Sequence, residues 1–377
     1  MLLTAPSPTV DPLWQLTADC ARDTRPDRLD LIVGVYRDDA GVAPVMGAVR
    51  EAERRLAERA GSKAYVGLGG NERFTRMTTA LLFADAGLES RTDGIQAVAG
   101  TGALRLLADL LAATGPDRTV HLGTPAYVNH QAILTAAGLR VATHPVRDVL
   151  TAMDQARPGD VLLLQGCCHN PTGWNMPAPM WDELAAALTR RGVVPFIDQA
   201  YFGLGDGLTE DLDGMRRLLR AVPDAVVAVS ASKAWSLYSE RTGCALVVSD
   251  DPARRGQARA LLENIARASY SQPPAHGAAI VEEILGDPAL AAGWHGELSA
   301  MRARLTTLRD GLAGRLGLPG LAEQRGMFLT LPLDAAAMRR LTTEFAVYGL
   351  PTGRINLAGI PAPRLDDVAT AIRAVTG

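Results

Sequence analysis

Short apolar runs alternate with helical patterns through the middle of this chain, and this alternation most restricts the folds it can adopt. Val161 to Leu164 is purely apolar, as buried parallel strands are. The segment from Pro177 to Arg190 has helical spacing and ends at Gly192. Such alternation predicts a mostly parallel sheet with helices on both faces. We expect further strands at residues 95–99, 118–122, 193–197, 225–229 and 245–248, and a further helix at 103–113.

The length of 377 residues predicts two domains rather than one small core. The strand–helix alternation stops near Leu298, where a long Arg-rich helical pattern begins. We therefore expect a large domain at residues 43–299. A smaller domain is expected from residues 1–42, which include an N-terminal arm, together with residues 300–377.

Charge and cysteine content argue against several classes of protein. The net charge of −3 gives no reason to expect nucleic-acid or membrane partners, and no apolar run is long enough to span a bilayer. The first residues lack the basic start and apolar stretch of a secretory signal. Four cysteines fit neither a zinc site nor a disulfide framework, so we expect no metal and a cytoplasmic location: Cys20, Cys167, Cys168 and Cys244. The adjacent Cys167 and Cys168 are expected to pack in the core.

Lysine is almost absent from the chain. Of the 38 basic residues, 36 are Arg and only Lys63 and Lys233 are Lys. A deprotonated lysine amine can form an imine with a carbonyl cofactor, whereas arginine stays protonated. Lys233 follows an apolar strand, at the edge where α/β folds carry functional groups. From this residue alone, the alternative is an ordinary lysine in a surface loop.

Other groups suited to a phosphorylated cofactor also follow strands. Asp198 could keep a pyridinium nitrogen protonated, and Tyr201 lies three residues further on; alternatively, the aspartate begins a turn. Gly100-Thr101-Gly102, between a strand and a helix, could cradle a phosphate. Arg241 could neutralise that phosphate, although most arginines are expected at the surface. Asn170 to Gly173 is a turn by composition.

In this order, these segments resemble the aspartate/aromatic amino acid aminotransferase family (class I), whose members use pyridoxal 5′-phosphate (PLP). The resemblance runs from Asp11 to Gly359. It implies the PLP-dependent transferase fold type I, with a mostly parallel seven-stranded sheet in the large domain and a smaller α/β domain. It also implies a homodimer with shared active sites. The sharpest matches are His169-Asn170-Pro171-Thr172-Gly173, Asp198 with Tyr201, Leu237-Tyr238-Ser239-Glu240-Arg241, and Arg267 leading into Tyr270-Ser271-Gln272-Pro273-Pro274.

The resemblance assigns most of the cofactor contacts. Lys233 would bind PLP as an imine and move the proton during catalysis. Asp198 would pair with the ring nitrogen, supported by His130. The other contacts would be Asn170 and Tyr201 at the ring oxygen, Tyr127 on the ring face, Gly100, Thr101, Ser230 and Arg241 at the phosphate, and Tyr65 from the partner subunit.

The resemblance also implies the substrate contacts and the reaction. Arg354 would bind the substrate α-carboxylate, and Arg267 from the partner subunit would face the distal carboxylate of a dicarboxylic substrate. Gly34 would line a mobile substrate loop, and Asn170 would contact the substrate. We expect transfer of an amino group between an amino acid (aspartate, glutamate or aromatic) and a 2-oxo acid. The alternatives are β- or γ-elimination, replacement or another carbanion reaction on the same fold, and a non-enzymatic regulator.

Three positions depart from the family pattern. Ala99 stands where the family usually has a hydroxyl residue, and Tyr127 stands where it usually has Trp. Ala234-Trp235-Ser236 replaces the usual Asn-Phe-Gly after the lysine. These changes are compatible with PLP binding and bear mainly on the substrate.

Overall fold

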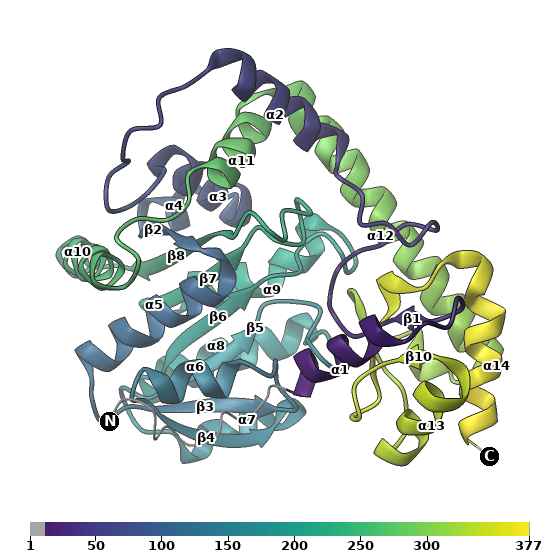
Figure 1. Cartoon of the computed structure of the whole chain (residues 1–377). Coiled ribbons are helices and arrows are strands. Elements are labelled where there is room, and N and C mark those ends of the chain that lie inside the picture. The colour runs from purple at the N-terminus through teal and green to yellow at the C-terminus, as the bar shows by residue number, and fades with distance from the viewer. Residues whose placement is uncertain (1–11, 377) are drawn as a thin grey trace, which may run out of the picture. The chain divides into compact units, whose positions relative to one another are not determined.

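The computed structural model describes residues 12–376, which form two compact units (Figure 1). The large unit contains residues 45–170 and 174–303; the small unit contains the described residues up to 44, residues 171–173 and residues 304–376. The sequence analysis placed the divisions two to four residues earlier, after 42 and 299. Asp11, where the family resemblance begins, and the arm before it lie outside the described residues.

A seven-stranded sheet forms the centre of the large unit, in the order β2-β8-β7-β6-β5-β3-β4. Only β8 runs antiparallel to its neighbours, so the predicted mostly parallel sheet is confirmed. The strands are β2 (Thr92–Val98), β3 (Thr119–Thr124), β4 (Arg140–Pro145), β5 (Val161–Gln165), β6 (Val194–Gln199), β7 (Asp224–Ser230) and β8 (Thr242–Ser249).

Helices surround this sheet, and the end of α8 follows from its sequence. Helix α8 ends at Gly192, whose φ of 67° lies in the left-handed region that favours glycine. The helices are α2 (Gly47–Arg59), α3 (Glu72–Phe83), α4 (Ala86–Ser90), α5 (Ala99–Thr114), α6 (His130–Ala136), α7 (Val149–Ala152), α8 (Ala178–Arg191), α9 (Leu208–Ala221), α10 (Pro252–Ser269), α11 (His276–Gly286) and the first half of α12 (Pro288–Leu316). Two 3₁₀ turns flank α7, at Val146–Asp148 and Met153–Gln155.

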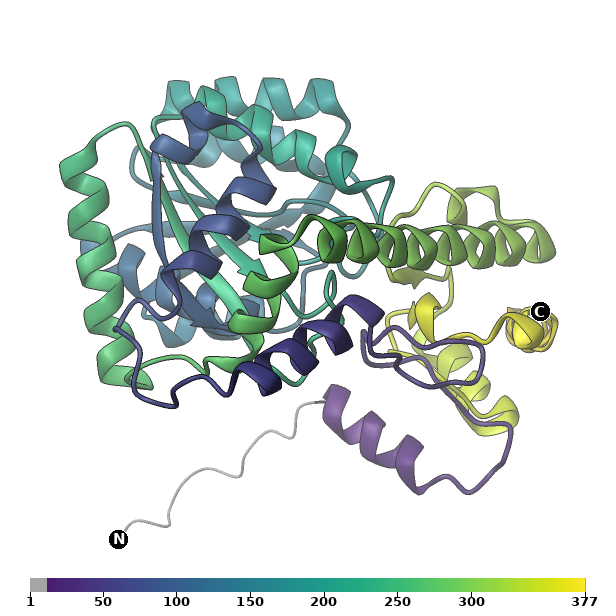
Figure 2. The same ribbon diagram turned by 90° about the horizontal axis from the view of Figure 1, so that it is seen from above.

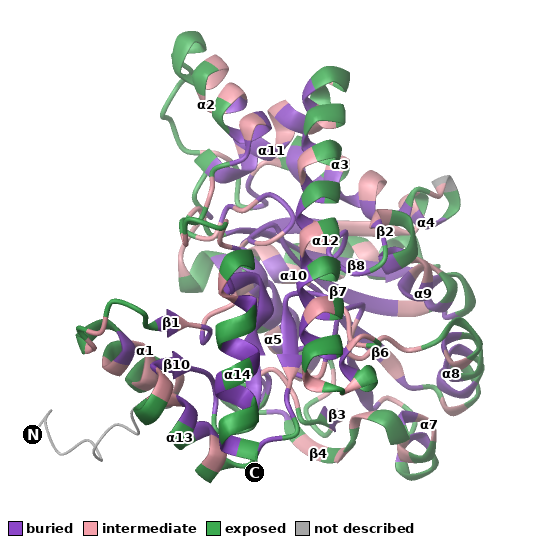
Figure 3. Ribbon diagram, turned by 90° about the vertical axis from the view of Figure 1, so that its right-hand side faces the viewer, coloured by how far each residue is buried: buried purple, intermediate pink, exposed green. Residues whose placement is uncertain are grey.

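The core of the large unit lies between the sheet and α5. Every residue of β8 is buried, and Figure 3 colours the ribbon by burial. The apolar side of α5 packs against the sheet through residues such as Leu104 and Leu107. Burying each such leucine contributes about 1.5–3 kcal/mol. The packed core therefore holds the carboxyl ends of the strands in a fixed arrangement.

The small unit has its own core and two short strand pairs. Strands β1 (Leu29–Asp30) and β10 (Val347–Tyr348) are parallel, and β9 (Phe328–Thr330) and β11 (Arg354–Asn356) are antiparallel. Its helices are α1 (Pro12–Arg22), α13 (Ala335–Phe345), α14 (Leu365–Thr376) and the end of α12, with 3₁₀ turns at Pro319–Leu321, Leu357–Gly359 and Ala362–Arg364. Residues 171–173 join this unit, since the amide of Arg325 donates to the carbonyl of Gly173 (2.6 Å) and the hydroxyl of Thr330 to that of Pro171 (2.8 Å).

The structure corrects two predicted boundaries and adds one strand. The long helix expected from Leu298 begins at Pro288 and is continuous to Leu316 (Figure 2). Ala99, expected at the end of a strand, is the first residue of α5. Strand β4 was not expected, because it is an edge strand without a buried apolar run. None of the described helices is both long and apolar enough to cross a membrane.

Candidate active site

Lys233 lies three residues beyond the end of β7, in a turn at the carboxyl edge of the sheet. Its side chain is partly buried, and its Nζ lies 5.2 Å from the centre of the Tyr201 ring. Burial lowers the pKa of the Lys233 amine to about 8; the Arg241 charge lowers it too, and the Asp198 carboxylate opposes the shift. A sizeable fraction of the amine is therefore uncharged, and nucleophilic, near neutral pH.

Asp198 and His130 form a buried pair beside this lysine. Asp198 is the second-last residue of β6, so it lies within the strand rather than just past it. The carboxylate is 8% exposed, and one of its oxygens lies 2.8 Å from Nε2 of His130. His130 begins α6, and its ring meets Tyr127 edge-on, with centroids 5.2 Å apart. The sequence-predicted partnership of Asp198 with His130 is thus seen as a direct contact.

Asn170 and Tyr201 also lie together, and Gln165 holds the backbone of Asn170. The Asn170 amide donates to the Tyr201 hydroxyl over 3.4 Å. The side chain of Gln165 accepts from the amide of Asn170 (2.8 Å) and donates to its carbonyl (2.9 Å). The sequence analysis missed Gln165, although a single polar residue at the end of the apolar run β5 was a usable signal.

A candidate phosphate cradle is formed where α5 approaches β7. Gly100 and Thr101 lie in the first turn of α5 rather than in a loop before it, so their amides belong to the helix N-terminus, which favours anions. A Cβ on Gly100 would lie 2.9 Å from the Cβ of Ser230, so a larger residue does not fit. Arg241 has φ 52°, and its guanidinium donates to the Tyr238 carbonyl over 2.9 Å.

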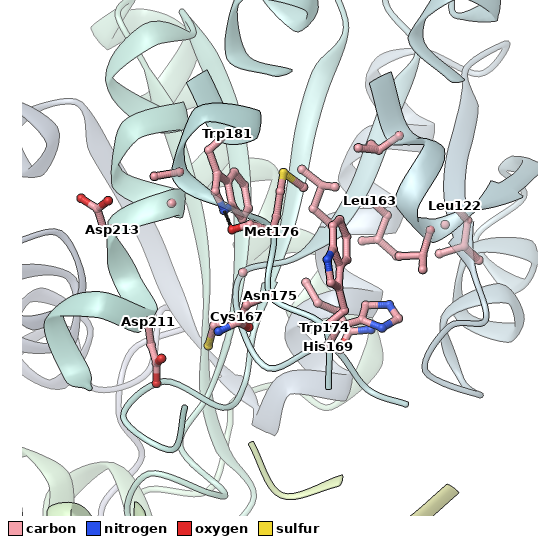
Figure 4. Close-up of a pocket in the computed structure, with 18 of the residues that line it drawn as sticks. Leu122, Leu163, Cys167, His169, Trp174, Asn175, Met176, Trp181, Asp211 and Asp213 are labelled. Atoms are coloured by element: carbon pink, nitrogen blue, oxygen red, sulfur yellow. Dashed lines mark hydrogen bonds between the residues drawn. The ribbon is translucent and has the colours of Figure 1, made fainter. Parts of the chain in front are cut away.

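A cavity of about 120 Å³ lies beside this site (Figure 4). His130 and His169 line it together with Trp174 and Trp181, and the Trp181 indole donates to the carbonyl of Met176 over 3.1 Å. Burial and the neighbouring His130 lower the pKa of His169 to about 4, so His169 is neutral at physiological pH. Because His130 of the site is among its lining residues, the cavity is part of the surroundings of the site.

In the small unit, Arg354 is held in a buried position. The side chain is 3% exposed, its guanidinium lies 4.4 Å from the centre of the Phe328 ring, and it donates to the carbonyl of Ile32. The same ring contacts Gly34, where an added Cβ would lie 2.6 Å from Phe328 Cζ. The sequence analysis proposed Arg354 and Gly34 but missed Phe328, which contacts both.

Tyr65 and Arg267 line one surface groove of the large unit. Tyr65 is 93% exposed, and Arg267, in the last turn of α10, is also exposed and donates to the Ser271 hydroxyl over 2.7 Å. Lys63 is exposed in the same groove. A tyrosine this exposed has room for a partner surface.

Among the described residues, Cys167, Cys168 and Asp211 form the one cluster with the spacing of metal ligands. Both cysteines are buried, as expected for core packing. The Asp211 carboxylate accepts three backbone amides: Oδ2 those of Gly203 and Gly205, and Oδ1 that of Asp206. The carboxylate therefore organises the loop before α9.

The residues at the sheet edge match the chemistry of PLP. The match consists of an amine of lowered pKa, a buried carboxylate paired with an imidazole, an amide–phenol pair, and a helix N-terminus beside a serine and an arginine. These are the kinds of group that the aldehyde, the ring nitrogen, the ring oxygen and the phosphate of the cofactor would require. Together with the mostly parallel seven-stranded sheet, they indicate a fold type I PLP enzyme.

Comparison with known proteins agrees with this assignment. Residues 26–372 match the family model described as aminotransferase class I and II. The chain is 43% identical to the tyrosine aminotransferase of Rhizobium meliloti (strain 1021), covering 95% of this chain and 96% of that one. It is 35% identical to the aspartate aminotransferase of Escherichia coli (strain K12), covering 97% of each.

A solved structure gives the same result in three dimensions. The aromatic-amino-acid aminotransferase from Burkholderia pseudomallei, covalently bound to pyridoxal phosphate, superposes with a TM-score of 0.95 at 34% identity, covering 100% of this chain and 99% of that one. The chain belongs to the class I and II aminotransferase family and is a PLP-dependent aminotransferase. Nothing in the comparisons favours elimination or replacement chemistry.

Proposed function

We propose that this enzyme moves the amino group of aspartate, glutamate or an aromatic amino acid to a 2-oxo acid, as a cytoplasmic homodimer of amino acid metabolism. The observation that carries the proposal is the grouping of Lys233, the Asp198–His130 pair and the Asn170–Tyr201 pair at the carboxyl ends of β7, β6 and β5. The relatives named for tyrosine, aromatic and aspartate substrates support the choice of substrates.

When bound, PLP supplies an aldehyde for the amino group and a ring that withdraws electrons from the substrate Cα. Lys233 provides the amine that binds the aldehyde. Lys233 would also hold and move the proton of the substrate Cα as general base and acid. Its lowered pKa, about 8, suits both roles near neutral pH.

The surrounding side chains orient the cofactor and the substrate. Asp198 would keep the ring nitrogen protonated, because a buried carboxylate stabilises a nearby positive charge. His130 holds the Asp198 carboxylate in place, and Tyr127 would cover the ring face. Asn170 and Tyr201 would bond the ring oxygen. Gly100, Thr101, Ser230 and Arg241 would hold the phosphate.

Two arginines and a glycine select the substrate. Arg354 binds the α-carboxylate through its planar fork, and Asn170 contacts the same group. Gly34 lets the backbone of the substrate loop lie close to the Phe328 ring, since any side chain there would meet that ring. Arg267 of one subunit faces the distal carboxylate of a dicarboxylic substrate in the other subunit, and Tyr65 reaches that subunit's phosphate.

The visible absorption spectrum of the purified protein tests the reaction. L-aspartate, L-glutamate and L-tyrosine are added in turn, and the product is analysed. We expect the yellow band to give way to the pyridoxamine phosphate band, with release of the matching 2-oxo acid. A band that persists with every amino acid, or a product other than a 2-oxo acid, would overturn the proposed reaction.

Subunit mixing tests the shared site. A Lys233→Ala chain and an Arg267→Ala chain each have poor activity on dicarboxylic substrates. In a mixed dimer, one site combines an intact Lys233 with an intact Arg267 from the other chain. We expect dicarboxylic activity to reappear on mixing and dissociation–reassociation; no recovery in mixed dimers isolated by affinity tags would contradict the shared site.

A further inference from the structure

Three aromatic rings pack behind the loop that carries Lys233. Trp235, two residues after the lysine, stacks on Trp294 of α12 with centroids 4.9 Å apart and planes 7° apart. Phe202, the residue after Tyr201, meets Trp235 edge-on at 5.7 Å. All three side chains are fully buried. The stack therefore joins the loop that holds Lys233 to the loop that holds Tyr201.

One hydrogen bond connects this stack to the lysine loop. The indole N–H of Trp294 donates to the carbonyl of Ala234 over 2.7 Å, sixty residues away in the chain. Ala234 directly follows Lys233 and is itself fully buried. In a dry environment a short, satisfied bond of this kind restricts the backbone strongly, because the carbonyl has no water to replace the indole.

The local sequence does not hold this turn unaided. Ser236 adopts φ 53°, in the left-handed region that favours glycine, and the related family usually has glycine there. A non-glycine residue stays in this conformation only where its surroundings impose it. The turn also closes through the Ser236 amide, which donates to the Lys233 carbonyl over 3.1 Å. An external restraint on this turn therefore acts directly on the backbone of Lys233.

We infer that Trp294 is a positioning residue for Lys233: its indole bond to Ala234, with the stacked Trp235, holds the lysine amine in its poorly hydrated place beside the Tyr201 ring. The inference rests on the proposed role of Lys233. Without the bond, the turn relaxes and the amine gains water, which favours its protonated form. The groups that face this amine are the Asp198 carboxylate, the Arg241 guanidinium and the Tyr201 phenol.

The test is a pH titration of the visible absorption of the holoenzyme, comparing Trp294→Phe with Trp235→Phe. In the loaded enzyme this absorption reports protonation of the Lys233 nitrogen in its imine with the cofactor, and the same gain of water would favour the protonated form of that nitrogen. Both variants keep an aromatic ring in the stack. Only the first removes a bonded N–H, since the Trp235 indole N–H has no hydrogen-bond partner among residues 12–376. We expect the midpoint to rise by about half a pH unit or more in Trp294→Phe and to stay near the wild-type value in Trp235→Phe. Equal shifts, or none in Trp294→Phe, would overturn the inference.

Two further measurements keep the result interpretable. Trp181→Phe removes another buried, bonded indole, on α8, and an equal midpoint shift there would assign the effect to general loosening. If Trp294→Phe does not fold, the indole N–H signals of the five wild-type tryptophans are followed by NMR. One indole N–H signal should then change with pH at the same midpoint as the visible absorption. If no signal does so, Trp294 does not position Lys233. A Lys233→Ala chain that still bound the cofactor covalently would instead refute the proposed function.

Discussion

Arg354 and Arg267, the two arginines proposed to bind substrate, have opposite surroundings. Arg354 is buried on β11, with Phe328 against its guanidinium and the Ile32 carbonyl as acceptor. Arg267 is exposed at the end of α10, and its described hydrogen bond is to a nearby serine hydroxyl. A rigid arginine suits the α-carboxylate, which every amino acid carries. An exposed one suits side chains that differ, because it has room to bind a distal carboxylate or to turn aside for an aromatic ring.

The largest expected effect is complete loss of activity, and it serves as the reference for the two arginine variants. Lys233→Ala should abolish covalent cofactor binding and activity with every substrate, because no other amine lies in the site. The measurement is the visible spectrum after gel filtration, with Lys63→Ala, which removes the only other lysine, as the control. A retained band in Lys233→Ala would mean that the lysine is misassigned.

Arg354→Ala should weaken all substrates alike. Loss of a buried, bonded charge costs about 2–5 kcal/mol, roughly thirtyfold or more in KM or kcat/KM. The measurement is steady-state kinetics with aspartate and tyrosine, and Arg354→Lys keeps the charge while removing the fork. If one substrate is spared, Arg354 does not bind the common carboxylate.

Arg267→Ala should lower kcat/KM for dicarboxylic substrates much more than for aromatic ones. An exposed charge-assisted bond contributes about 1.5–3 kcal/mol, so kcat/KM for aspartate should fall at least roughly tenfold while that for tyrosine stays within a factor of two. Arg254→Ala, an exposed arginine on the same helix, is the matched control. Equal losses for both substrates would erase the contrast between the two arginines.

The smallest expected effect concerns the rigidity of Arg354. Phe328→Leu removes the aromatic face under the guanidinium, which is worth about 1 kcal/mol, so KM should rise roughly fivefold for all substrates. Phe345→Leu changes a half-buried phenylalanine that packs against the core of the same unit, and it is the control for lost packing. If the two variants behave alike, the ring acts through packing rather than through the arginine.

Local sequence predicted the sheet and the lysine but not the contacts that set their geometry. Apolar runs such as β5 and β6 are recognisable because buried parallel strands need them, and residues after such strands lie at one edge. The start of α5 was missed because Ala99 adopts φ 55° and bonds the Arg241 carbonyl, a partner 142 residues away. No local pattern reports such a partner.

The candidate site divides in the same way. Lys233 and Asp198 could be singled out from strand ends, whereas the roles of His130, Tyr65 and Arg354 came only through the family resemblance. Neither the strand ends nor the family resemblance singled out Trp294 and Phe328, since apolar residues in helices and strands usually belong to the core. Their importance comes from one atom each: an indole N–H aimed at Ala234 and a ring face under Arg354.

The chain has two lysines, one exposed and one in the site, so a reagent that reacts with amines can distinguish loaded from empty chains. Lys63 lies open in its groove, whereas Lys233 is occupied whenever the cofactor is attached. The N-terminal amine aside, a dye that acylates amines should therefore label a loaded chain once, at Lys63. It should label an empty chain twice, at Lys63 and Lys233. Intact-mass spectrometry of the labelled protein would report the fraction of loaded chains directly, without reference to turnover.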